Sequence, residues 1–168
     1  MTAVKIRPFC DQDIERLTEI YNWYISETTI TFDLEPYTVE QRRSKWMSHY
    51  GVTGRHRLLV AESGAQVVGY ASSSQLRIKA AYDPSVEVSI YLSHSARGLG
   101  IGSRLYESLF KQLQQEDVHR AYAGITLPND ASLAFHQKFG FSEVGRFHEV
   151  GRKFDRYWDV MWLEKRMQ

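Results

Sequence analysis

The residues with the clearest chemistry lie in a glycine-rich segment, which reads Arg-Gly-Leu-Gly-Ile-Gly from Arg97 to Gly102. Glycines let the backbone approach a ligand closely, and the first amide groups of a following helix favour an anion. The alternating residues 86–92 before it predict a half-buried strand, and residues 103–116 after it predict an amphipathic helix. A strand, a glycine loop and a helix in this order form a corner suited to a phosphate group.

The spacing of the glycines distinguishes three kinds of phosphate loop. The dinucleotide fingerprint needs a glycine at its sixth place, but counting from Gly98 that place holds Ser103. The triphosphate loop needs Gly-Lys-Ser/Thr, whereas Gly102 is followed by serine and arginine. The pattern Arg-x-x-Gly-x-Gly that remains resembles the pyrophosphate-binding signature of the GNAT superfamily of N-acetyltransferases, which hold coenzyme A. A plain glycine-rich turn is the alternative interpretation.

Composition limits the classes of protein to consider. The chain has 168 residues and a formal net charge of +1, so we expect one domain over residues 1–168 and no broad basic surface for nucleic acid. The single cysteine, Cys10, cannot form an internal disulfide, which favours a reducing, cytoplasmic setting. No apolar run approaches the roughly 18 to 20 residues of a membrane helix, so no membrane partner is expected.

Hydrophobic periodicity predicts which elements hold this corner in place. Residues 28–36 are irregular and predict a loop, and residues 76–84 predict a positively charged connection. The predicted strands are 4–7, 58–62, 66–74, 86–92, 121–126, 141–150 and 157–163, and the predicted helices run from a cap at Asp11 or Asp13 to Tyr24, then over 38–50, 103–116 and 129–139. This order predicts an α/β fold with a mixed sheet covered by helices on both faces.

Short fragments along most of the chain resemble the phosphinothricin acetyltransferase branch of the GNAT superfamily in their order and spacing. They include Thr31-Phe32, Ser89–Leu92, Asn129–His136 and Val150–Phe154. The resemblance implies the GNAT fold, with a mostly antiparallel central sheet. It also implies acetyl transfer from acetyl-CoA to the α-amino group of phosphinothricin, methionine sulfoximine or a related small amino acid, and a homodimer.

The same resemblance indicates where acetyl-CoA would lie. Backbone amides of the glycine loop would hold the pyrophosphate, and the backbone of strand 86–92 would pair with the pantetheine arm. Asn129 could bond the same arm or cap its own helix, and Ser132 has the same two interpretations. The implied cofactor residues are Ile90, Tyr91, Leu92, Arg97, Gly98, Leu99, Gly100, Ile101, Gly102, Ser103, Asn129 and Ser132.

Glu87 is the candidate general base. An amino-acid ammonium must lose a proton before it can attack a thioester, and Glu87 is a carboxylate in the middle of a β-favouring run. Its side chain is expected opposite Val86 and Val88. The alternative is a solvated residue on the exposed face of the strand.

His136 is the candidate acid that would protonate the departing thiolate. Many members of the superfamily have a tyrosine at a comparable place on this helix, and His136 departs from that pattern. It could donate a proton, bond coenzyme A, or lie on the helix face. Tyr106, Tyr122 and solvent remain as alternatives.

An anionic amino acid would need cations and apolar walls around it. Arginine suits a carboxylate or phosphinate because it offers paired hydrogen bonds. The candidates are Arg77, Lys79 and Lys153 as cations and Phe32 and Tyr82 as walls, with an ordinary surface or packing role as the alternative for each. The branch usually has phenylalanine and arginine where this chain has Leu76 and Lys79. The histidines show no metal-ligand spacing, so no metal is expected.

The sequence is also compatible with other functions. The chain could be a non-catalytic module that binds acyl-CoA, but Glu87 and the nearby cations favour an enzyme because cofactor binding requires neither. It could also acetylate a protein N-terminus or a polyamine. A polyamine would need an acidic rim, and residues 76–84 are more basic than acidic.

Overall fold

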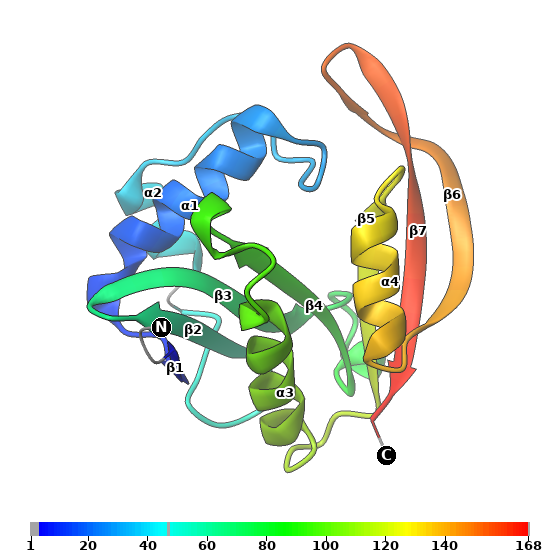
Figure 1. Ribbon diagram of the computed structural model, residues 1–168. Helices are drawn as coiled ribbons and strands as arrows, with labels where there is room; N and C mark the ends of the chain where they lie inside the picture. The colour runs from blue at the N-terminus through cyan, green and yellow to red at the C-terminus, as the bar shows by residue number, and fades with distance from the viewer. Residues whose placement is uncertain (1–3, 47, 168) are drawn as a thin grey trace.

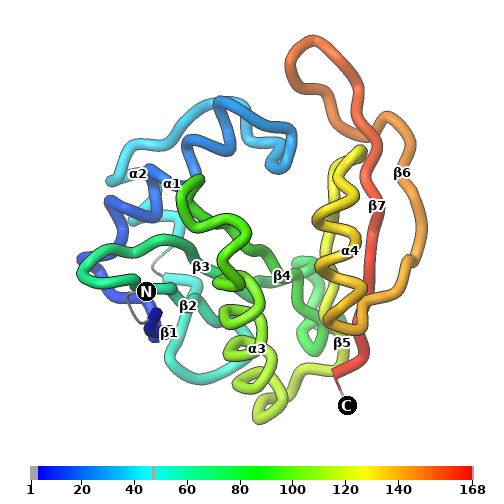
Figure 2. Tube along the Cα trace, viewed as in Figure 1, coloured from blue at the N-terminus to red at the C-terminus, as the bar shows by residue number. Residues whose placement is uncertain are grey.

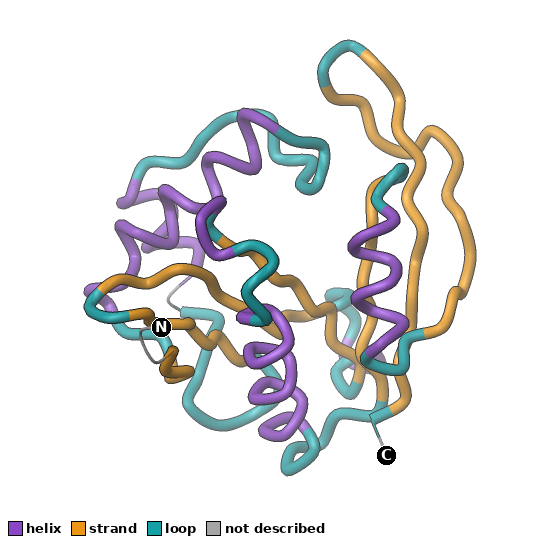
Figure 3. The backbone as a smooth tube through the Cα atoms, viewed as in Figure 1, coloured by secondary structure: helices purple, strands orange, loops and turns teal. Residues whose placement is uncertain are grey.

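Residues 4–46 and 48–167 are described by the computed structural model, and they form one seven-stranded sheet with helices on both faces (Figure 1). The strands are β1 (Val4–Pro8), β2 (Arg57–Ser63), β3 (Gln66–Gln75), β4 (Ser85–Leu92), β5 (Arg120–Thr126), β6 (Ser142–Lys153) and β7 (Arg156–Arg166), and the helices are α1 (Ile14–Glu27), α2 (Val39–Trp46), α3 (Ile101–Leu113) and α4 (Asp130–Lys138). The spatial order is β1-β2-β3-β4-β5-β7-β6. Figure 3 shows the order that the sequence predicts, in which two helices follow β1, three strands come next, and α3, β5, α4, β6 and β7 complete the described chain.

The sheet is antiparallel except at its centre, where β4 and β5 run parallel. Their register covers only the pairs Ser85–Arg120, Val86–Ala121 and Glu87–Tyr122. Beyond Glu87 the two strands diverge (Figure 2). The mixed, mostly antiparallel sheet is therefore confirmed, and its centre is open on one side of residue 87.

Each face of the sheet has its own core. Val86 and Val88 are buried with α3 residues such as Leu105 on one face. On the other face, Tyr70 packs against α1 residues such as Tyr24. Because successive strand residues point to opposite faces, Glu87 lies on the α1 side, as the alternation predicts.

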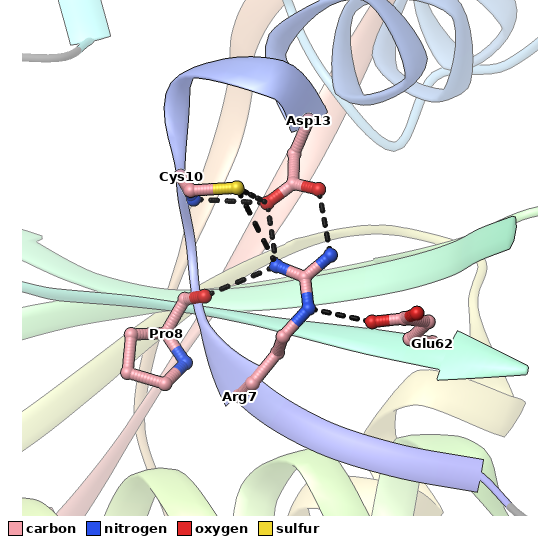
Figure 4. A network of polar contacts seen from close by, with 5 residues as sticks. All are labelled: Arg7, Pro8, Cys10, Asp13 and Glu62. Carbon is pink, nitrogen blue, oxygen red and sulfur yellow. Dashed lines mark hydrogen bonds and ion pairs between the residues drawn. The ribbon is translucent and has the colours of Figure 1, made fainter. Parts of the chain in front are cut away.

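A polar network fastens the start of α1 to the sheet (Figure 4). Arg7 on β1 donates to both oxygens of Asp13 at 2.7 and 2.8 Å and to Glu62 on β2 at 2.6 Å. Burial alone would raise the pKa of Asp13, but the hydrogen bonds from Arg7 and from the Cys10 amide outweigh burial and lower it. The network fixes where α1 begins, and α1 carries Tyr21 and Tyr24.

The predicted helix ends agree with the structure to within a few residues. The Thr38 hydroxyl accepts from the Gln41 amide at 3.1 Å, and the Gln41 side chain accepts from the Thr38 amide at 2.9 Å. Asn129 caps α4, and Gly140 follows its end with φ 82°. Helix α2 ends at Trp46 rather than near residue 50, and residue 47 lies outside the described residues. Within the described ranges, no helix is long and apolar enough to cross a membrane.

Candidate active site

A cavity of about 480 Å³ lies where β4 and β5 diverge. Because the sheet is open there, side chains from both of its faces reach the cavity. The cavity is lined on the side of α1 by residues that include Tyr21, Thr31, Phe32 and Glu87, and on the side of α3 and α4 by Tyr106, Asn129, Ser132 and His136. Two ligands entering from opposite faces would meet beside β4.

Glu87 lies in the wall of this cavity. Its side chain is half-buried, and burial raises its pKa above the usual 4.5, while the charge of Arg77 acts in the lowering direction. A carboxylate with a raised pKa is a stronger base than one in water, which suits it to accept a proton from an ammonium group. The geometry is compatible with the base role that the sequence predicts.

The five candidate substrate residues separate into three groups. Phe32 and Arg77 line the cavity. Lys79 and Tyr82 are exposed and are absent from the cavity wall. Lys153 is buried behind the wall, where its Nζ donates to the backbone oxygen of Thr31 at 2.8 Å.

The glycine loop has space for an anion. Gly98 and Gly100 have positive φ values of 75° and 73°, and a Cβ on either would meet nothing within 4 Å. Gly100 is the N-cap of α3, so the amides of the first helical turn, from Ile101 to Ser103, have no acceptor within the helix. This surface is compatible with the diphosphate site that the sequence predicts.

Arg97 lies beside this loop on an aromatic support. Its guanidinium carbon is 4.6 Å from the ring centre of Trp23 and 5.3 Å from that of Tyr24. His94 also contacts Trp23, with ring centres 6.0 Å apart. No local pattern in the sequence indicates this contact, because it joins segments far apart in the chain.

The edge of β4 that faces β5 has backbone groups for a ligand. Ser93 donates to Val68 on β3 at 2.8 Å, and by alternation the amide of Tyr91 also faces β3, while those of Ile90 and Leu92 face the opening. Leu92 is already partnered, because its amide donates to the Tyr24 hydroxyl, which in turn donates to the Leu92 carbonyl. Ile90 is therefore the best placed of the three to pair with a pantetheine arm.

Asn129 and Ser132 act at the start of α4. The Asn129 side chain accepts from the Ser132 amide at 3.1 Å, so the capping interpretation is confirmed, and both residues also line the cavity. The side-chain NH₂ group of Asn129 retains donors for a ligand.

His136 is buried and bonded on both ring nitrogens. Nδ1 lies 2.8 Å from the carbonyl oxygen of Ser132, which can only accept, so Nδ1 carries the hydrogen. Nε2 then accepts from the Tyr106 hydroxyl at 2.9 Å. Burial lowers the pKa of His136, which favours this neutral form. Of the two alternative tyrosines, Tyr106 lines the cavity and Tyr122 does not.

Tyr21 and Thr31 line the cavity but were not among the predicted site residues. The Tyr21 hydroxyl donates to Asp33 at 2.6 Å and lies 2.7 Å from the Thr31 hydroxyl. The sequence places Tyr21 in the apolar stripe of a helix, and a tyrosine hydroxyl in such a stripe is the signal that could have identified it. Among the described residues, no group of three or more His, Cys, Asp or Glu side chains is placed to hold a metal ion.

Comparison with known proteins gives consistent results. A model of the acetyltransferase (GNAT) domain matches residues 6–162. A phosphinothricin N-acetyltransferase of Streptomyces coelicolor is 51% identical over 164 residues, which cover 96% of this chain and 95% of that protein. An L-methionine sulfoximine/L-methionine sulfone acetyltransferase of Pseudomonas paraeruginosa is 28% identical over 162 residues, covering 96% and 94%. A GNAT phosphinothricin acetyltransferase of Sinorhizobium meliloti, solved in complex with acetyl-CoA, matches with a TM-score of 0.90 at 29% identity, covering 99% of this chain and 89% of that one.

Proposed function

This chain belongs to the GNAT acetyltransferases, and on that basis we propose that it transfers the acetyl group of acetyl-CoA to the α-amino group of a small anionic amino acid, with Glu87 as the general base. The acceptors that we propose are phosphinothricin and methionine sulfoximine, on which the named relatives act. The observation that carries the proposal is Glu87 itself, a half-buried carboxylate in the wall of a cavity that opens to both faces of the sheet.

Two protons must leave the acceptor during the reaction. Glu87 takes the first from the ammonium, which frees the nitrogen lone pair for attack on the acetyl carbonyl. In this proposal the Ile90 amide, at the open edge of β4, bonds the carbonyl oxygen as its charge develops, and the Ile90 carbonyl on the same edge remains for the pantetheine arm. The second proton leaves the same nitrogen after attack and ends on the thiol that is released, so proton balance requires no further acid.

Arg77 supports an anionic acceptor. It lines the same cavity as Glu87, and its guanidinium can bond a carboxylate or phosphinate in a paired geometry. A bound anion would occupy the acceptor side, between Arg77 and Phe32. Lys79 lies outside the cavity, and so contributes at most a long-range charge.

We further propose a homodimer that forms along β6. This strand is at the edge of the sheet, and Val144, Phe147 and Val150 on it are each about half exposed. A long edge strand with apolar side chains favours pairing with another chain. Light scattering after size exclusion should give twice the chain mass, and the change Val144→Glu should shift the protein to monomer.

A thiol-release assay with acetyl-CoA tests the main proposal. The acceptor panel contains phosphinothricin, methionine sulfoximine, neutral amino acids of similar length, a polyamine and a peptide with a free N-terminus. We expect turnover with the first two and little with the last two. Tight binding of acetyl-CoA without turnover of any amine would instead support a non-catalytic acyl-CoA module.

A further inference from the structure

Two segments far apart in the sequence meet at one side of the cavity. Lys153, at the end of β6, donates to the backbone oxygen of Thr31, 122 residues away, in the loop after α1. Thr31 and Phe32 line the cavity from this loop, and Phe147 and Val150 line it from β6. The contact therefore joins two walls of the cavity that the opened sheet does not hold together.

Gly151 makes the second contact between these walls. A Cβ on Gly151 would lie 2.2 Å from Cε2 and 2.5 Å from Cζ of Phe32, which is shorter than any ordinary contact. Gly151 pairs with Trp158 in the β6–β7 ladder, and its φ lies outside the left-handed region. The backbone conformation at residue 151 would accept a side chain, but any side chain there would have to displace the Phe32 ring.

The loop is held from its other side as well. The Tyr21 hydroxyl contacts both Thr31 and Asp33, which fastens the loop to α1. On the hairpin side, the Trp158 indole donates to the Lys153 carbonyl at 2.8 Å. Lys153 is only 3% exposed, and such a buried ammonium needs its hydrogen bonds kept in place. Thr31 and Phe32 therefore have little freedom to move.

We propose that Gly151 and Lys153 are positioning residues for acceptor specificity, because they fix Phe32 and Thr31 across the cavity and so set the length of the amino-acid side chain that fits. This inference rests on the proposed amino-acid acetyl transfer. A difference of one methylene in an apolar pocket is worth about 10- to 200-fold in selectivity. Displacement of the Phe32 ring would likewise change the shape of this wall.

The test compares Gly151→Ala with Gly145→Ala, a matched change in the same strand where a Cβ meets nothing within 4 Å. We would measure kcat and KM for acetyl-CoA and for a series of amino acids of increasing length. In Gly151→Ala, the ratio of kcat/KM between long and short acceptors should change by about tenfold or more. The KM for acetyl-CoA, and all values for Gly145→Ala, should stay near those of the wild type.

A double variant removes the clash. Phe32→Leu leaves space for the new methyl group, so Gly151→Ala combined with Phe32→Leu should have the selectivity of Phe32→Leu alone. Effects that simply multiply would show that the two residues act independently. If Gly151→Ala fails to fold, this double variant is compared directly with Phe32→Leu.

Lys153→Met provides an independent test of positioning. The loop that it loosens forms the wall that sets side-chain length, so the preference between long and short acceptors should change, and at a given length KM should rise equally for neutral and anionic amino acids. A rise confined to anionic acceptors would instead mean that Lys153 binds the substrate charge directly, and would overturn its positioning role.

The outcomes separate the two proposals. If the wild type acetylates amino acids and Gly151→Ala keeps its selectivity, or loses activity equally toward all acceptors, the inference is overturned and acetyl transfer stands. If the wild type acetylates no amino acid, the proposed function fails first, and the inference fails with it.

Discussion

The hydroxyl of Tyr106 donates to Nε2 of His136 at 2.9 Å, deep in the wall of the cavity. This hydrogen bond, together with the one at Nδ1, determines whether His136 can donate a proton. With Nδ1 bonded to the Ser132 carbonyl, a neutral His136 has no hydrogen to give at Nε2. Donation to a thiolate would require the doubly protonated ring, whose formation burial opposes by lowering the pKa.

The first prediction concerns this pair. An imidazolium acid would lose activity as pH rises through a pKa below 6.5, the usual histidine value. Because the neutral His136 cannot act as this acid, we expect kcat of the wild type not to fall between about pH 6 and pH 8. A fall in this range that disappears in His136→Gln would establish His136 as the acid that the sequence predicts.

The second prediction concerns Glu87. The change Glu87→Gln should lower kcat by about 10²- to 10⁴-fold while preserving the shape of the side chain. Since a base acts in its deprotonated form, kcat/KM of the wild type should rise with pH through a value above 4.5, and this rise should vanish in the variant. An unchanged kcat with an unchanged pH profile would remove Glu87 from the role.

The third prediction compares two neighbouring cations. Arg77→Ala should raise KM for an anionic acceptor by about tenfold or more, because it removes a charge-assisted bond, and should leave KM for acetyl-CoA unchanged. It should also move the acidic limb of kcat/KM to higher pH, since Arg77 lowers the pKa of Glu87. Lys79→Ala is the control, because Lys79 does not line the cavity. Equal effects of the two changes would contradict this arrangement.

The fourth prediction concerns the anion site at α3. Gly98→Ala should raise KM for acetyl-CoA by about tenfold or more, because the methyl group narrows the approach to the loop amides. Gly54→Ala is matched to it, since Gly54 also has a positive φ, 90°, and open space around its Cα. Both changes should lower the free energy of unfolding by about 1 to 2 kcal/mol, because alanine is strained at a positive φ. If Gly54→Ala weakened acetyl-CoA binding as much, strain rather than position would be the cause.

The fifth prediction concerns stability at low pH. The pKa of Asp13 is lower in the folded protein than its usual 3.8, so its charged form stabilises the fold above that value, and the contribution is lost as pH falls through the folded pKa. Asp13→Asn should cost about 1.5 to 3 kcal/mol at pH 7. In urea unfolding, the difference from the wild type should shrink below about pH 4. A difference that did not depend on pH would mean that packing, not charge, is lost.

Local patterns predicted most of the fold. Alternation in residues 86–92 placed Glu87 opposite Val86 and Val88, and the caps at Thr38 and Asn129 were readable because capping depends on residues three apart. Each of these signals lies within one helix or strand, so it can be recognised without knowing which elements pack against it.

Contacts between distant segments could not be predicted. The sequence carries no local sign that Lys153 reaches Thr31, that Trp23 supports Arg97, or that Tyr106 bonds His136. Each of these contacts depends on how far two elements lie apart after the sheet has formed. For the same reason, Lys79 and Tyr82 were grouped with Arg77 by nearness in sequence, although only Arg77 lines the cavity.

The short seam between β4 and β5 has a thermodynamic consequence. After Glu87, the backbone amides and carbonyls of β4 and β5 no longer form hydrogen bonds with each other, and the protein lacks the stability that these bonds would add. A ligand that binds in this space would form some of the missing hydrogen bonds, so a ligand with higher affinity should also raise the free energy of unfolding more. Each catalytic cycle would then alternate between a tighter and a looser form of the same molecule, with product release as the loosening event.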